Sequence, residues 1–279
     1  MNRLGWAGVL RRAVLIAAGL AWLVPIYLLV VNAVRPSAAF TGTNEWTLPS
    51  SFGLFENVAT AEQASGLAGS LASTALYSIV SPALAVVIGA LAGFGVSVLQ
   101  PRRPFFWFMV AFGGAVFPAQ MLLVPLFVAY AQLNLYNTPQ GLVIVYTALS
   151  VPLAALVLRN FFGGVPPHLF QAAQIDGASL WTTFWRIYMP VAWSALVAVF
   201  ILEFTFIWND LLFGLTLASS NSVRPVMPAL ASLQSAYGGS TIPVVLAGGI
   251  VASLPPVVVF LAAQRFFARG LTLSQVAEA

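Results

Sequence analysis

Four residues that could bind a solute lie close together in one apolar stretch: Glu203, Trp208, Asn209 and Asp210. Glu203 and Asp210 are seven residues apart, about two helical turns, so both carboxylates are expected on one helix face. An ionised carboxylate inside a membrane costs about 2.5–3.5 kcal/mol and should face protein or a water-filled cavity. This fifth-span cluster fits a polar path for a solute or a set of braces between helices.

A second polar group interrupts the apolar sequence at residues 159–190, called the polar loop below. Pro166 and Pro167 preset the first turn of a helix from about His168. Gly177 can adopt the left-handed conformation that ends such a helix. The sequence therefore predicts a short helix inside the polar loop.

A second short helix is predicted to follow in the polar loop. Ser179 or Asp176 can cap its start, and Pro190 is expected to close it. Its aromatic residues recur at helical spacing and are Trp181, Phe184, Trp185 and Tyr188. We expect this face along the membrane interface or packed on helix ends. Small side chains at Ala172 and Ala173 would admit a close partner, although a packing loop without a partner is the alternative.

The residue types that the chain lacks exclude much chemistry. It contains no Cys, so disulfides, zinc–thiolate sites and cysteine nucleophiles are ruled out. All 11 basic residues are Arg, so the lysine-containing phosphate-binding loop is absent and any ATP must be bound by another subunit. The Arg residues do not form one basic patch, which argues against nucleic acid. His168, the single histidine, has no second base beside it for catalysis.

The composition is typical of a polytopic membrane protein. Hydrophobic residues make up 60% of the chain and charged residues 6%. The 279 residues accommodate about six spans and no large second domain. Apolar runs and their breakers predict an all-α fold with six transmembrane helices, at residues 13–34, 69–99, 105–131, 141–158, 191–217 and 243–264.

The distribution of Arg predicts the orientation. With the N-terminus in the cytoplasm, only Arg35 and Arg224 fall outside, whereas Arg3 and the others lie inside. Both termini and the polar loop are then cytoplasmic. The first span is expected to be retained, because its apolar run is too long for a signal peptide. The external segment after the fifth span, residues 218–242, carries Arg224 and Tyr237 and is expected to contact a docked protein, since it is long for the alternative of a plain connector.

One pair of glycines predicts a close helix contact. Gly89 and Gly93 form a G-x-x-x-G on the second span, which would let another helix approach closely. Because Gly and Ala are abundant in this chain, chance could also produce this spacing.

The polar loop resembles a known signature. Ala172, Ala173, Gly177, Ile187 and Pro190 are similar in type and spacing to the E-A-A-x3-G-x9-I-x-L-P signature of permease subunits in bacterial binding-protein-dependent ABC importers. Three further segments resemble its carbohydrate-uptake, MalG-like branch: Ile175-Asp176-Gly177-Ala178-Ser179, Trp208-Asn209-Asp210 and Arg265-Phe266-Phe267-Ala268-Arg269-Gly270-Leu271. The resemblance implies a MetI-like permease domain at residues 69–264, preceded by residues 1–68 and followed by a cytoplasmic tail, residues 265–279.

The resemblance also implies a function and a set of partners. The polar loop would be the coupling helix that docks on the ATPase, through Gln171, Ala172, Ala173, Asp176, Gly177, Ile187 and Pro190. The partners would be a second, MalF-like permease, two ATP-binding subunits and an extracytoplasmic solute-binding protein, in a bacterial plasma membrane. The cargo would be a sugar, with the fifth-span cluster on its path. The chain itself would be no enzyme and bind no metal or cofactor, since ATP and Mg²⁺ belong to the partner ATPase.

The chain departs from the signature at Gln171, where the family usually has Glu, and at Met189, where it has Leu. Glu could form a charge-assisted bond to an Arg of the ATPase, whereas the neutral bond of Gln is weaker by about half. Docking is therefore expected to be weaker or tuned to a particular ATPase. Met for Leu nearly conserves volume.

Two other classes of function are weighed against this one. A secondary transporter would work without an ATPase and is expected to show related halves and intramembrane ion ligands, for which only Glu203 and Asp210 qualify. An intramembrane enzyme is disfavoured by the missing Cys and the missing G-x-S-x-G elbow.

Overall fold

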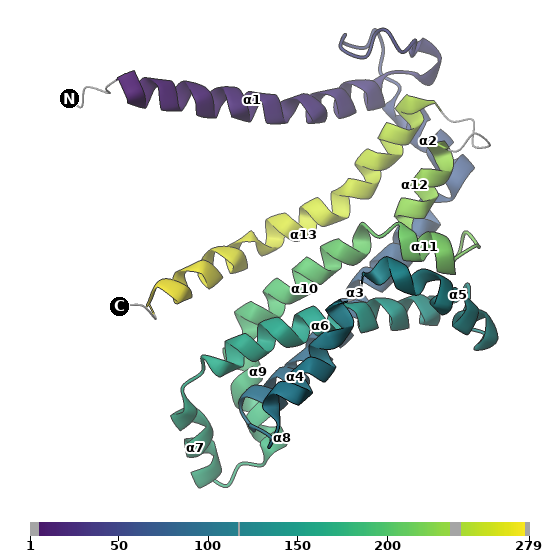
Figure 1. Ribbon diagram of the computed structural model, residues 1–279. Coiled ribbons are helices and arrows are strands. Elements are labelled where there is room, and N and C mark those ends of the chain that lie inside the picture. Colours follow the sequence, from purple (N-terminus) through teal and green to yellow (C-terminus); the bar gives the residue numbers. More distant parts are fainter. Residues whose placement is uncertain (1–5, 117, 235–240, 277–279) are drawn as a thin grey trace. The chain divides into compact units, whose positions relative to one another are not determined.

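The computed structural model describes residues 6–116, 118–234 and 241–276, and every regular element among them is a helix (Figure 1). The chain forms two compact units, one from Met1–Leu67 with Leu230–Leu254 and one from Ala68–Ala229 with Pro255–Ala279. The all-α prediction is therefore confirmed. Arg3, named in the topology prediction, and Tyr237, named in the predicted contact with a docked protein, lie outside the described residues.

The first unit contains α1 (Trp6–Val34), the short turn η1 (Ser37–Ala39) and α2 (Leu54–Ser65). Asn57 of α2 is buried and donates to the carbonyls of Ala33 and Arg35 at 2.9 and 2.8 Å. The buried Arg35 donates in turn to the carbonyls of Asn44 and Thr47 at 2.8 and 2.6 Å. Because buried carbonyls need partners, these bonds fix the connection between α1 and α2.

The second unit is built around α3 (Leu67–Ser97), α6 (Pro139–Gly163) and α10 (Trp193–Trp208). Two further helices, α12 (Val226–Gln234) and α13 (Ile242–Val276), each divide between the two units. The core of the second unit contains aromatic residues from several elements, and among them are Phe94, Phe162, Phe184 and Tyr188. Residues distant in sequence are therefore joined by apolar packing.

Four helices are long and apolar enough to cross a membrane among the described residues, namely Leu10–Val34, Leu67–Ser97, Pro139–Gly163 and Ile242–Gln264. They correspond to the first, second, fourth and sixth predicted spans. A fifth is obtained if Leu180–Val191 and Trp193–Trp208, which meet at 75°, count as one span. The predicted number of six is thus not confirmed, because two of the predicted helices are broken.

The third predicted span, residues 105–131, is not one helix, so that prediction is wrong. It consists of α4 (Pro104–Phe112), η2 (Gly113–Val116), η3 (Ala119–Leu122) and α5 (Leu123–Gln132). Gly113 and Gly114 each weaken a helix by about 1 kcal/mol relative to Ala. Pro118 has no N–H to donate, and its ψ of 122° lies outside the helical region.

The fifth predicted span, residues 191–217, is also broken, between the end of α10 at Trp208 and α11 (Leu212–Leu217). Asn209 Nδ2 donates to the carbonyl of Thr205 at 2.8 Å, and Asp210 accepts from the N–H of Gly214 at 2.9 Å. Short polar side chains that bond nearby backbone compete with the helical ladder. The polar residues themselves therefore separate α10 from α11.

The glycine pair on α3 contacts α6, as the G-x-x-x-G spacing predicts. A Cβ added at Gly89 would lie 2.6 Å from the Cβ of Ala154, and one added at Gly93 would lie 2.7 Å from the backbone N of Arg159. Only glycine leaves room for the α6 backbone at these two positions. The prediction of a close helix approach is confirmed.

Gly93→Ala is expected to destabilise the protein by about 1–3 kcal/mol, because the α6 backbone cannot move aside for the added methyl group. The matched control is Gly95→Ala on the same helix, where an added Cβ would meet no atom within 4 Å. Alanine should stabilise the helix there by up to about 1 kcal/mol. Thermal unfolding of the detergent-purified protein tests both, and equal midpoints for the two variants would contradict the expectation.

Candidate functional site

The polar loop begins with α7 (Pro167–Ile175), which follows the end of α6 (Figure 1). Pro167 occupies its first turn, and Gly177 follows it with φ of +72°. The N–H of Ala178 donates to the carbonyl of Ala173 at 3.0 Å, which closes the helix. The predicted helix and its glycine end are confirmed.

α7 presents one exposed face and is anchored by the other. Ala173 is buried and Phe170 packs on Phe94, with ring centroids 6.5 Å apart. The exposed positions at the C-terminal end of α7 and just after it are Gln171, Ala172, Gln174, Ile175, Asp176 and Gly177. Ile175 is 86% exposed and offers apolar area that a partner could cover. The exposed face therefore combines small, apolar and polar side chains, so a partner could both pack on it and form hydrogen bonds with it.

The second part of the polar loop starts at Ser179, whose Oγ accepts from the N–H of Thr182 at 3.1 Å. It comprises α8 (Leu180–Thr183), the π-helix η4 (Phe184–Tyr188) and α9 (Met189–Val191). The prediction of Ser179 as a cap is confirmed. The prediction that Pro190 closes the helix is wrong, because the chain stays helical to Val191. The wider π-turn before Pro190 accommodates its missing N–H.

The aromatic residues of this second part divide between two environments. Phe184 and Tyr188 are buried, and their rings lie 5.4 and 4.9 Å from that of Phe94 on α3. Trp181 and Trp185 remain exposed. Ile187 packs against the same buried cluster. Because interiors are close-packed and transmit strain, a displacement of the polar loop would be passed to the membrane helices.

The fifth-span cluster makes its contacts to α6. Glu203 is 4% exposed and accepts from Ser150 Oγ at 2.5 Å. Asp210 accepts from the Tyr146 hydroxyl at 2.8 Å. Since α10 ends at Trp208, the prediction that both carboxylates share one helix face is wrong. Their partners on α6 are four residues apart and do share a face.

The other two members of the cluster differ in exposure. Trp208 is buried and stacks on Phe204, with ring centroids 5.4 Å apart. Asn209 is exposed. The observed bonds of Glu203 and Asp210 are those of braces between helices, and contact with a solute stays a prediction. Among the residues that the structure describes, no group of three His, Asp or Glu could hold a metal ion.

Asp210→Ala is expected to lower stability by about 1–2 kcal/mol, because the carboxylate bonds the start of α11 and the Tyr146 hydroxyl. Asp210→Asn keeps one acceptor oxygen and should lose about half as much. Tyr146→Phe is the matched control, since it removes only the bond between the helices. Thermal unfolding in detergent measures all three, and an unchanged midpoint for Asp210→Ala would count against a bracing role.

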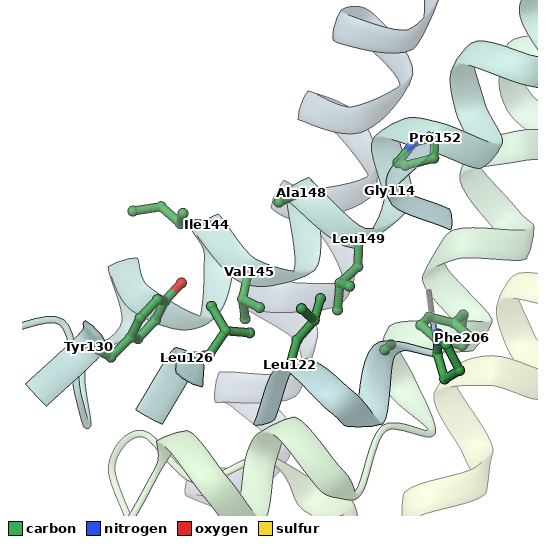
Figure 2. A pocket seen from close by; sticks show the side chains of 12 residues that line it. Gly114, Leu122, Leu126, Tyr130, Ile144, Val145, Ala148, Leu149, Pro152 and Phe206 are labelled. Carbon is green, nitrogen blue, oxygen red and sulfur yellow. The ribbon is translucent and has the colours of Figure 1, made fainter. Parts of the chain in front are cut away.

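Sequence reasoning missed an apolar cavity of about 600 Å³ in the second unit. Figure 2 shows Leu122 and Leu126 opposite Val145 and Leu149 of α6, with Phe206 at one end. No member of the fifth-span cluster lines the cavity. The helix breakers at Gly113, Gly114 and Pro118 are the sequence signal for it, because the broken third span forms one wall.

The sequence of this region is shared with known proteins. Residues 85–273 match the family described as binding-protein-dependent transport system inner membrane component. The chain belongs to this family. It is therefore a membrane-spanning permease subunit of a binding-protein-dependent ABC importer, and both the polar loop and the fifth-span cluster lie within the matched residues. The boundaries predicted for the permease domain, 69 and 264, stay a prediction.

Individual relatives agree with this family. The osmoprotective compounds uptake permease protein GgtD of Synechocystis is 28% identical over 262 residues, which are 91% of this chain and 87% of GgtD. The trehalose transport system permease protein SugB of Mycobacterium tuberculosis is 33% identical over 214 residues, which are 75% of this chain and 78% of SugB. The fold is similar to that of a chain in the crystal structure of a bacterial ABC transporter that imports alginate, with a TM-score of 0.79, 20% identity and coverage of 96% and 99% of the two chains.

Proposed function

We propose that this permease subunit takes up a sugar, in a transporter driven by ATP hydrolysis in partner subunits. The observation that supports a sugar as cargo is the 33% identity to SugB over three quarters of the chain. The name of SugB assigns trehalose to that protein. The MalG-like segments around Ile175 and Trp208 support the same class of cargo.

In the proposed assembly, the chain and a second, MalF-like permease enclose the path through the membrane. Two ATP-binding subunits bind ATP and Mg²⁺ on the cytoplasmic side, and an extracytoplasmic solute-binding protein delivers the sugar. The distribution of Arg supports an orientation with both termini and the polar loop in the cytoplasm. α2 and α12 are then external, and the exposed residues of α2 offer ordered surface to the binding protein.

The polar loop acts as the docking element for one ATP-binding subunit. The exposed face around Gln171, Ala172 and Ile175 enters a cleft of that subunit, where Ile175 loses its contact with water. Movement of α7 is carried by the packing of Phe184 and Tyr188 on Phe94 to the membrane helices. This linkage switches the path between inward and outward access.

The sugar passes beside the fifth span. Asn209 is the exposed member of the cluster and offers its amide to sugar hydroxyls. Glu203 and Asp210 keep α10 and α11 against α6, and the buried Trp208 supports them. This division of roles follows from the hydrogen bonds, since a carboxylate already bonded inside the chain is less free to contact cargo.

The complete transporter in liposomes, supplied with its solute-binding protein, is expected to take up trehalose or another oligosaccharide only when ATP is present inside. Labelled sugars, an amino acid and a dipeptide form the test panel. Uptake driven by a proton or sodium gradient without ATP would instead make the chain a secondary transporter. ATP-driven uptake of the amino acid or dipeptide alone would overturn the sugar assignment.

A further inference from the structure

Two adjoining cavities in the second unit differ in polarity. The basic pocket, of about 580 Å³, lies where α3 ends, α4 begins and α6 ends, and its polar lining is Ser97, Gln100, Arg159 and Asn160. The apolar groove, of about 380 Å³, is lined by Ala92, Gly95, Val96, Pro101, Trp107 and Val110. Val96 and Pro101 line both. A polar mouth therefore continues into an apolar groove.

The basic pocket has the charge of an anion site. Arg159 stacks on Phe108, with its guanidinium carbon 4.6 Å from the ring centroid, and donates to Asn160 Oδ1 at 3.3 Å. Its buried Nε has no hydrogen-bond partner. Arg102 and Arg103 are exposed on the connection between α3 and α4, directly before Pro104 of the lining. Arg159 is the charged residue of the lining, which contains no Asp or Glu, so an anion in the pocket would meet one guanidinium group, with two more on the adjoining connection.

The apolar groove runs from the helix ends toward the membrane interior. From Val96 back to Ala92 it follows α3 for about 6 Å, and from Trp107 to Val110 it follows α4 for about 4.5 Å, at 1.5 Å per residue. Phe105 and Val110 of α4 are 72% and 61% exposed, as expected of a helix that faces hydrocarbon. The mouth thus lies at headgroup level and the groove at acyl-chain level.

We propose that this combined site binds an anionic phospholipid, with the phosphate in the basic pocket and the upper part of one acyl chain in the apolar groove. Basic pockets between helices on the cytoplasmic side suit such headgroups. The leaflet is the one on the side of the polar loop. The lipid ties the start of the broken third span to the end of α6, from which α7 follows, so it supports the element proposed to dock the ATPase.

Native mass spectrometry of the whole transporter tests whether the site prefers an anionic headgroup. The transporter is titrated with phosphatidylglycerol or with phosphatidylcholine that has the same acyl chains. The wild type should retain phosphatidylglycerol in preference. Arg159→Gln and the double variant Arg102→Gln with Arg103→Gln should each lower that retention about fivefold or more, as expected for the loss of a surface guanidinium. Arg186→Gln, an exposed position on the same side but outside the pocket, should leave it unchanged.

The acyl-chain part is tested by Gly95→Leu. An added Cβ at Gly95 meets no atom within 4 Å, so leucine fills the groove without disturbing the fold. Phosphatidylglycerol retention should fall about fourfold for each acyl methylene group that leucine displaces from the groove. Gly19→Leu on α1, where an added Cβ also meets nothing within 4 Å, is the matched control.

Three results would overturn the proposal. If the Arg159→Gln and Gly95→Leu variants retain as much phosphatidylglycerol as the wild type, the lipid does not bind at this site. The basic pocket would be a site for a free anion if inorganic phosphate, at the same concentration as the lipid, displaced it equally well from the wild type and from Gly95→Leu. Gly95→Cys gives this cysteine-free chain one thiol, which phosphatidylglycerol should protect from a membrane-soluble maleimide. Equal protection in phosphatidylcholine would mean that the groove does not select an anionic lipid.

Discussion

Deletion of residues 171–177 is expected to abolish sugar uptake while the permease still inserts into the membrane. The deletion removes the exposed face of α7 and the left-handed Gly177. It spares Phe94, Phe162 and Tyr188, which hold the membrane helices together. If the docking proposal is right, the ATP-binding subunits should no longer copurify, since loss of central interface residues costs about 2–4 kcal/mol each. Copurified ATPase together with full uptake would contradict docking through the polar loop.

Ala172→Arg separates docking from folding, because Ala172 is exposed and a longer side chain there starts from the surface. Its bulk and charge should keep the ATPase surface away and lower both copurification and uptake about tenfold or more. The matched control is Gln132→Arg, an exposed position at the end of α5, on the opposite side of the proposed membrane. Equal losses in both variants would indicate a general effect of added charge rather than docking.

The polar loop could be predicted because its signals are local. Pro167 at a first turn, Gly177 with positive φ and the Ser179 cap each act within a few residues of their own position. Those signals specify α7 and the start of α8 without knowledge of neighbours. Pro190 was misread because its effect depends on the preceding turn, and the change from α to π geometry at Phe184–Tyr188 leaves no mark in hydropathy.

The long helices could also be predicted, because an apolar run of twenty residues in a membrane has few alternatives to a helix. The two broken spans show the limit of this argument. Averaged hydropathy hides Gly113, Gly114 and Pro118, although each has a local reason to end a helix. In the fifth span, Asn209 and Asp210 were interpreted as part of a solute path or as braces between helices, and they also bond backbone and thereby end one helix and start the next.

The partners of the fifth-span cluster could not be predicted from one sequence. Ser150 and Tyr146 lie 53 and 64 positions before the carboxylates that they bond. Only the packing of α10 and α11 on α6 brings them together. The apolar cavity and the proposed lipid site have the same origin, since each joins residues from separate helices. Local sequence thus specifies elements in this chain, whereas its sites arise between elements.

Glu203→Ala is expected to lower uptake about tenfold while the amount of permease in the membrane stays normal. The carboxylate is the acceptor for Ser150 Oγ inside the second unit, and its loss leaves a buried hydroxyl without its partner, at a cost of about 1–3 kcal/mol. α10 would then lose a bond to α6 at the level where the path is proposed. Normal uptake by this variant at normal membrane levels would rule out a role for Glu203 in transport.

Two further variants decide whether Glu203 acts through Ser150 or on the sugar. Glu203→Gln keeps an acceptor for Ser150 but removes the carboxylate, so it should retain uptake within about threefold if the residue is a brace. Ser150→Ala removes the same bond from α6 and should reproduce the loss seen in Glu203→Ala. If Glu203→Gln loses uptake as severely as Glu203→Ala, and Ser150→Ala does not, the carboxylate contacts cargo directly. Direct contact with cargo would also be indicated if Glu203→Gln changed the half-saturating sugar concentration but kept wild-type thermal stability. Loss of a brace lowers stability, whereas loss of a contact with the sugar alters binding.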